Sequence, residues 1–158
     1  MDKELFIAEV KAVQNALRSF LLALCNGRKA DADDIAQDAL MKAFVARDKY
    51  YDKGQFKSWI FKIAYNTFLN HAAAQRQYDS LEEAETLAGK GTADSSYEHQ
   101  QLYLALATLP PRERSAITLY YLSGYSIKEI AAITECSEDA VKKQLSRGRE
   151  KLKETIKL

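Results

Sequence analysis

Basic and amide side chains are concentrated near the end of the chain. Between residues 142 and 149 the basic and amide residues, with one serine, are Lys142, Lys143, Gln144, Ser146, Arg147 and Arg149. Lysine and arginine neutralise phosphates, and Arg, Gln and Ser also form hydrogen bonds with base edges in the major groove of DNA. Between residue 142 and the end of the sequence only Glu150 and Glu154 oppose this positive charge. These residue types therefore predict a DNA-binding surface.

Two helices joined by a tight turn are predicted to position these side chains. Ser126 and Glu129 have the spacing of a capping box, in which each side chain pairs with a free backbone amide of the other residue. A break over residues 134–136 precedes Ser137, which is expected to cap the basic helix. A helix rich in lysine and arginine is by itself also typical of a solvated surface. The spacing of a helix-turn-helix favours DNA binding instead.

Further helices are predicted earlier in the chain, because apolar residues recur there three and four positions apart. The expected helices cover residues 4–24, 31–49, 56–75, 99–109 and 112–122. Pro110 and Pro111 separate the last two, because proline breaks a helix and is tolerated in the first turn of the next one. With the helix-turn-helix, the last two helices make up a predicted four-helix module.

The stretch between these groups of helices has a different composition. Residues 78–98 combine acids, glycines and small residues with little apolar periodicity, which is typical of an acidic flexible linker. Its negative charge offsets the basic residues around it, so the chain has a net charge of only +1. The sequence predicts an all-α protein of two small domains, residues 1–77 and 99–158, joined by this linker.

Other classes of site have little support. Cys25 and Cys136 lie in apolar surroundings without a nearby second ligand, which favours two buried, reduced thiols. His71 and His99 have no ligand-like neighbours at helical spacing, so we expect neither a metal nor a cofactor. Because no nucleophile with a base and no glycine-rich phosphate loop is found, we expect no enzyme. The amphipathic N-terminus and short apolar stretches predict a cytoplasmic protein without membrane insertion.

The stretch from Leu106 to Lys153 resembles region 4 of the sigma factors of bacterial RNA polymerase. In that family, region 4 reads the −35 element of a promoter and rests on the β flap of the polymerase. The resemblance assigns DNA contacts to the stretch from Lys142 through Arg149, and a backbone contact to Tyr120. The chain departs from the family at Glu135 and Asp139, where glycine is common.

Residues 31–72 resemble region 2 of the same family almost throughout. In that family, the first helix of region 2 docks on the β′ coiled coil of core RNA polymerase. The resemblance therefore assigns polymerase binding to Asp34, Gln37 and Asp38, which lie opposite the apolar residues of this helix. Acids near a helix start also serve as caps, but that alternative explains Gln37 and Asp38 poorly.

The turn and helix that follow match the part of the family that reads the −10 element. The DNA is melted there, and bases are held out of the stack against the protein. The resemblance implies an aromatic pocket for a base, made by Tyr50, Tyr51 and Phe56. It implies that Asn66 and Asn70 read base edges and that Lys57 and Lys62 contact phosphates. Trp59 has a spacing more typical of a packed core. Family members commonly continue with a run of arginines, whereas residues 72–77 contain a single one, so weaker phosphate contacts are expected.

Together the two resemblances imply a sigma factor of the extracytoplasmic-function type. Such a protein binds core RNA polymerase and directs it to promoters by contacting double-stranded and melted DNA. The alternative is a transcription factor of the response-regulator type, whose four-helix output domain is similar. That protein needs a receiver or sensing domain, yet the first half of the chain shows no alternation of strands and helices. Family members are often held silent by an anti-sigma factor, a partner that the sequence permits without requiring it.

Overall fold

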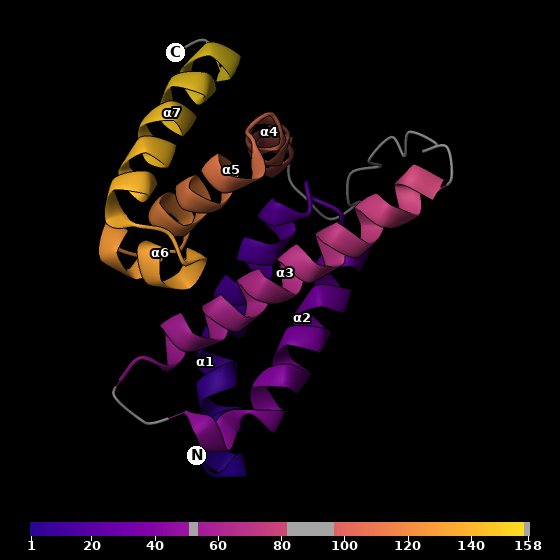
Figure 1. The fold of residues 1–158 in the computed structure, drawn as a ribbon, viewed down its shortest axis with the longest axis vertical. Coiled ribbons are helices and arrows are strands. Elements are labelled where there is room, and N and C mark those ends of the chain that lie inside the picture. Colours follow the sequence, from indigo (N-terminus) through magenta and orange to yellow (C-terminus); the bar gives the residue numbers. More distant parts are fainter. Residues whose placement is uncertain (51–53, 82–96, 157–158) are drawn as a thin grey trace.

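The computed structural model is all-helical over the residues that it describes, 1–50, 54–81 and 97–156. Figure 1 shows the elements, which are α1 (Lys3–Leu24), α2 (Lys29–Val45), the 3-10 turn η1 (Arg47–Lys49), α3 (Phe56–Leu81), α4 (Tyr97–Ala107), α5 (Pro111–Ile117), the π-helical turn η2 (Thr118–Leu122), α6 (Ile127–Thr134) and α7 (Glu138–Ile156). The predicted all-α class is confirmed. None of the described helices is both long and apolar enough to cross a membrane.

The first three helices pack around a common core. The Asp2 side chain caps α1, since the backbone N–H of Leu5 donates a hydrogen bond to its Oδ1 at 2.8 Å. Phe20 of α1 and Phe61 of α3 are both fully buried, and their ring centroids lie 5.3 Å apart. On α2 the buried residues include Ala36 and Ala39, whose small side chains let the helices approach closely. This apolar packing turns most polar residues of α2 and α3 away from the core of the three helices.

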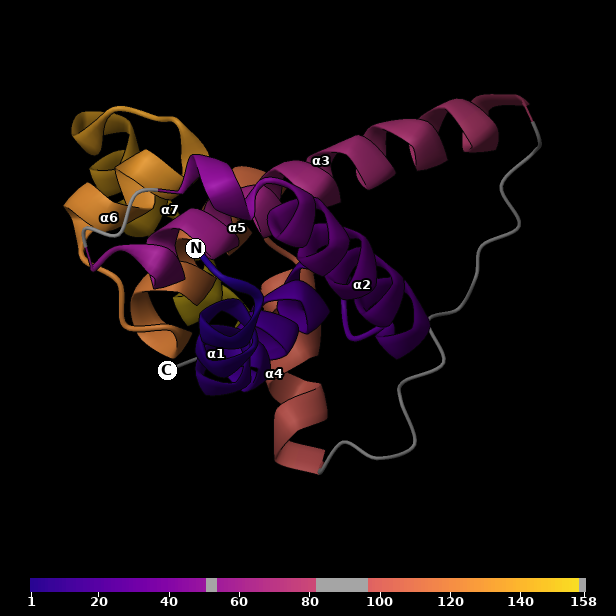
Figure 2. The same cartoon turned by 90° about the horizontal axis from the view of Figure 1, so that it is seen from below.

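Several helix boundaries differ from the predicted ones, and α4 covers Tyr97–Ala107 instead of 99–109. Helix α2 begins at Lys29, before the acidic cluster, and Arg28 precedes it without a side-chain cap. Helix α3 continues to Leu81 and extends beyond its neighbours in Figure 2. Its last turns consist mainly of Ala, Gln and Arg and contain neither Gly nor Pro, so nothing stops the helix at residue 75. The described helices thus include 78–81, 97 and 98 of the predicted linker, and residues 82–96 lie outside the described part.

The helix-turn-helix is formed by α6 and α7. The capping box is present, because the backbone N–H of Glu129 donates to Ser126 Oγ at 3.1 Å and that of Ser126 to Glu129 Oε1 at 3.0 Å. Ser137 caps α7 by accepting a hydrogen bond from the Ala140 N–H at 3.1 Å. Glu135 lies in the turn with a φ of 57°, in the left-handed region that glycine adopts easily. The departure from the family at Glu135 therefore falls on a backbone position that suits glycine.

The two domains lie against each other. Helix α6 packs on α3, and α1 contacts α4, α5 and η2. Arg114 of α5 is buried at this junction and donates a hydrogen bond from Nη1 to the Leu24 carbonyl at the end of α1, at 3.1 Å. The helical domains therefore form one compact body.

Candidate nucleic-acid interface

Helix α7 presents most of its predicted DNA-contacting residues to solvent. The exposed ones are Lys142, Lys143, Ser146, Arg147 and Arg149. Val141 and Leu145 are buried on the opposite face and hold the helix against its domain. Because the apolar face is anchored, the basic side chains point away from the core, as a recognition helix requires.

Gln144 differs from its neighbours because it is half-buried. Its Nε2 lies 3.8 Å from the sulfur of Cys136, which is also 3.7 Å from Arg112 Nη1. A base edge would therefore compete with Cys136 for the Gln144 amide. The expectation of two buried thiols is only half right, because Cys136 is partly exposed. Cys25 is buried, and burial raises the pKa of its thiol to about 11, which keeps it protonated and unreactive.

Tyr120 is partly exposed beside α7, as a contact to the DNA backbone requires. Its neighbour Tyr121 is more exposed, and its hydroxyl accepts a hydrogen bond from Arg149 Nη1 at 2.9 Å. Tyr121 therefore orients a predicted DNA-binding arginine, a role that was not predicted from the sequence. The signal available in the sequence was a second tyrosine directly after Tyr120, at the end of the predicted helix 112–122.

Helix α2 carries an exposed stripe that contains the predicted polymerase-binding residues. Asp34 and Gln37 are exposed, and Asp38 is partly exposed. Met41 and Val45 continue the line four and eight positions after Gln37, and they are 65% and 76% exposed. Aligned apolar side chains left in water beside polar ones are typical of a surface that binds another protein. Met41 and Val45 were not among the predicted residues, because their exposure is evident only once the buried face of α2 is known.

Asp38 forms a polar cluster with residues of α2 and α3. Its Oδ2 accepts a hydrogen bond from His71 Nε2 at 3.0 Å and lies 3.4 Å from Lys42 Nζ. The hydrogen bond with His71, followed by the positive charge of Lys42, holds the pKa of the Asp38 carboxyl below its ordinary value. The cluster therefore keeps Asp38 ionised and fixed in direction on the α2 stripe.

The cause of this pKa shift can be tested by substitution. We expect His71→Ala to raise the pKa of Asp38 towards its ordinary value, and Lys42→Ala to raise it less, as judged by an NMR titration of the carboxyl carbon. Because the folded state favours the ionised carboxylate, the cluster stabilises the fold fully at a pH above the ordinary pKa of an aspartate. This added stability is lost as the pH falls through the lowered pKa of Asp38. An unchanged pKa in His71→Ala would remove the hydrogen bond as its main cause.

Helix α3 exposes the polar residues that are predicted to read the −10 element. Lys62, Asn66 and Asn70 are all exposed and follow one another at intervals of four residues. This spacing places them in one line along the helix surface. Lys57 is also exposed, but it lies five residues before Lys62, about 140° round the helix axis, and so outside this line. The structure thus brings Lys62, Asn66 and Asn70 together on the surface of α3, with Lys57 apart from them.

The predicted aromatic pocket is not open in this structure. Tyr50 and Phe56 are buried, with their ring centroids 5.7 Å apart in an edge-on contact. Each ring also packs on Trp59, as expected for a core residue, and the Tyr50 hydroxyl accepts a hydrogen bond from the Gln55 N–H at 3.0 Å. A base could stack on these rings only after they moved apart, because the burial of apolar area favours the packed cluster. Tyr51 lies outside the described residues.

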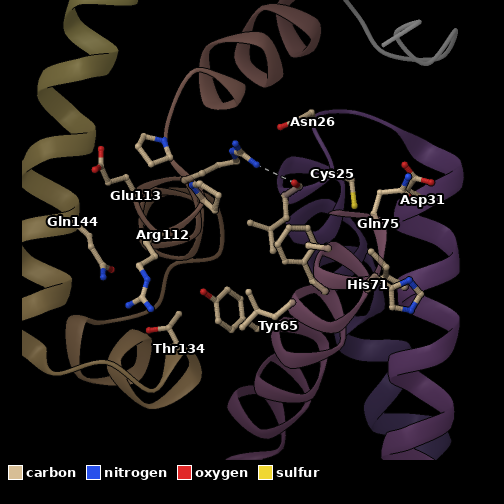
Figure 3. A pocket seen from close by; sticks show the side chains of 18 of the residues that line it. Cys25, Asn26, Asp31, Tyr65, His71, Gln75, Arg112, Glu113, Thr134 and Gln144 are labelled. Carbon is tan, nitrogen blue, oxygen red and sulfur yellow. Dashed lines mark hydrogen bonds between the residues drawn. The ribbon is translucent and has the colours of Figure 1, made fainter. Parts of the chain in front are cut away.

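A cavity of about 990 Å³ lies between the two domains. Figure 3 shows Arg112, Thr134 and Gln144 on the side of the helix-turn-helix, and His71 and Gln75 on the opposite side. The recognition-helix residues Lys143 and Arg147 also line it. Part of the predicted DNA-binding face of α7 therefore lines the cavity between the domains.

Comparison with known proteins gives matches to both halves of the chain. The family model described as Sigma-70 region 2 matches residues 10–78, and that described as Sigma-70, region 4 matches residues 99–152. The chain is 29% identical over 149 residues to ECF RNA polymerase sigma factor EcfG of Rhodopseudomonas palustris (strain TIE-1), covering 91% of this chain and 81% of the relative. It is 32% identical over 136 residues to the ECF RNA polymerase sigma-E factor of Escherichia coli (strain K12), covering 76% and 71%.

A solved structure extends this likeness to the arrangement of the domains. The sigma factor RpoE of Bartonella quintana, in a co-crystal with the anti-sigma factor NepR, matches with a TM-score of 0.85 and 31% identity over 97% of both chains. An output domain of the response-regulator type would not account for the match to region 2 over residues 10–78. With both regions present in order and a full-length structural match, the chain belongs to the ECF sigma factors of the sigma-70 family, the subunits that direct RNA polymerase to promoters.

Proposed function

We propose that this chain binds core RNA polymerase through the exposed stripe of α2. The observation that carries this proposal is the line of Gln37, Met41 and Val45, in which apolar side chains of one helix remain exposed beside an amide. Protein interfaces combine an apolar centre with polar groups that fix the orientation, and this stripe has both. The β′ coiled coil is the proposed partner for the stripe, with Asp34 and Asp38 at its polar edge. The β flap is proposed to receive the C-terminal domain.

We also propose separate DNA-binding roles for α3 and α7. The line of Lys62, Asn66 and Asn70 on α3 supports contacts with the melted −10 element, with Lys57 as a further phosphate contact. The basic face of α7 supports reading of the −35 element in double-stranded DNA, together with Tyr120. Two weak modules of one chain reinforce each other once the first is bound, because the second then acts at a high effective concentration.

Regulation by an anti-sigma factor is part of this proposal. The Bartonella quintana relative was solved with such an inhibitor, and the chain matches it over nearly its whole length, including the arrangement of its domains. A protein that binds polymerase and DNA acts in the cytoplasm, and we propose a regulatory rather than a catalytic role for it.

Reconstituted transcription with purified core polymerase tests the proposed function. The chain should support initiation from specific start sites on fragments of its source genome. We expect Gln37→Ala combined with Asp38→Ala to weaken binding to core polymerase by about tenfold, which corresponds to about 1.4 kcal/mol. Glu4→Ala with Asn15→Ala removes similar groups from exposed positions on α1 and should leave binding unchanged.

Two results would contradict the proposal. Tight binding to promoter DNA without polymerase, combined with no specific initiation, would indicate a stand-alone regulator. If the double variant of Gln37 and Asp38 bound core polymerase as tightly as the parent, this part of α2 would not belong to the interface.

A further inference from the structure

The helix-turn-helix domain covers part of the face of α3 that carries Lys57 and Lys62. Tyr125, just before α6, is buried, and its ring packs edge-on against Phe61 with the centroids 5.1 Å apart. The ammonium group of Lys57 lies over the same tyrosine ring, 5.3 Å from its centroid. One residue of the C-terminal domain thus engages two neighbouring side chains of α3.

Glu135 adds a second contact between the same elements. Its Oε1 lies 3.5 Å from Lys62 Nζ. The backbone of Glu135 has a φ of 57°, which is unfavourable for a residue with a side chain and easy for glycine. A glycine would relieve this strain but would lose the ion pair with α3. The contact between the domains is therefore a physical reason for a glutamate at this strained position.

Both DNA-binding surfaces are restricted in this arrangement. Lys57 and Lys62, the proposed phosphate contacts of α3, are engaged by Tyr125 and Glu135. Lys143 and Arg147 of α7 face the cavity of about 990 Å³, a size typical of a small-molecule pocket and far too small for a DNA duplex. The domains must move apart before the whole basic face of α7 can enter a major groove.

The same contacts allow the two domains to separate. The hydroxyl of Tyr125 is buried without a hydrogen-bond partner among the described residues, so separation of the domains would let water satisfy it. Lys62 and Glu135 are 46% and 61% exposed, and an ion pair that is so accessible to water is weak and screened by salt. These contacts hold the closed arrangement without locking it.

We propose that Tyr125 and Glu135 form an interdomain latch with Lys57, Phe61 and Lys62, which holds the helix-turn-helix domain over the promoter-reading face of α3 in the free protein. The latch must open before the chain binds promoter DNA. The consequence for DNA binding rests on the proposed roles of α3 and α7, whereas the closed arrangement itself does not.

The latch is tested on the full-length chain without polymerase. We expect Glu135→Lys to replace the ion pair with repulsion from Lys62 and to increase the radius of gyration measured by small-angle X-ray scattering. Combining it with Lys62→Glu restores the pair with reversed charges and should return the radius to that of the parent. Glu138→Lys makes the same charge change at an exposed position three residues away and should leave the radius unchanged.

A second measurement follows the binding of DNA. The apparent dissociation constant varies inversely with the fraction of open protein. We therefore expect Glu135→Lys to bind a short mixed-sequence duplex at low salt about fivefold more tightly than Glu138→Lys, which carries the same added charge. Glu135→Gly, which suits the left-handed backbone, should also open the protein and serves as the variant to measure if the lysine variant fails to fold.

The possible outcomes separate the latch from the proposed function. The latch would be overturned if Glu135→Lys and Glu135→Gly both had the radius of gyration of the parent. It would also be overturned if Glu138→Lys expanded as much as Glu135→Lys. Expansion confined to the Glu135 variants, in a chain that fails to initiate transcription, would support the latch and contradict the proposed function. Because scattering requires neither polymerase nor promoter, the two hypotheses fail independently.

Discussion

Replacement of Arg114 by methionine is expected to lower the free energy of unfolding by about 3 kcal/mol or more. The buried guanidinium donates hydrogen bonds to three backbone carbonyls, from Nε to Leu106 at 3.1 Å, from Nη1 to Leu24 at 3.1 Å and from Nη2 to Leu109 at 2.9 Å. Methionine fills a similar volume but donates nothing. The Leu106 carbonyl would keep the hydrogen bond that it accepts from the Leu109 N–H at 3.0 Å, but the Leu24 and Leu109 carbonyls would lose the arginine. Each buried acceptor left unpaired costs about 1–3 kcal/mol.

Urea denaturation followed by circular dichroism measures this effect, with Arg112→Met as the matched control. Arg112 is exposed two residues away, so the same chemical change should alter stability by no more than about 0.5 kcal/mol. Arg114→Lys keeps the charge but cannot reach three carbonyls in a fixed fork, and its stability should lie between that of Arg114→Met and the parent. Equal stability of the two methionine variants would show that Arg114 does not hold these carbonyls together.

The features that were predicted from the sequence depend on neighbouring residues. The capping box of Ser126 and Glu129 and the cap at Ser137 arise within one helical turn, so their residue types determine them directly. The basic face of α7 follows from a helical period in which Val141 and Leu145 take the buried side. For the same reason the all-α class and the helix-turn-helix could be predicted.

The features that could not be predicted depend on contacts between distant parts of the chain. Arg114 looks like one more basic residue in the sequence, and its role appears only when a carbonyl 90 residues away is placed beside it. Tyr50 and Phe56 illustrate the converse, because an aromatic residue beside a turn suits both a base-binding pocket and a core. In the structure their rings pack with Trp59. The pairing of Lys62 with Glu135 likewise needs both domains in place.

Gly148→Ala is expected to destabilise the protein although alanine is the better helix former. Gly148 lies inside α7, where helix propensity alone predicts a gain of about 1 kcal/mol from alanine. A methyl group at this position would lie 2.7 Å from Cγ1 and 3.1 Å from Cδ1 of Ile117, which is buried in α5. Overpacking of this kind costs about 1–3 kcal/mol, so we expect a net loss of about 1 kcal/mol in the free energy of unfolding.

A double-mutant cycle with Ile117→Ala separates packing from helix propensity. Truncating Ile117 removes both crowded atoms, so Gly148→Ala should become stabilising in that background, and the two substitutions should be coupled by about 1–3 kcal/mol. Ser146→Ala changes an exposed position of the same helix and should have little effect on stability. If Gly148→Ala stabilised the parent chain, α5 and α7 would have room to separate. The position of the recognition helix would then not depend on the close approach of α5 and α7. The expected loss of stability in Gly148→Ala would show that it does.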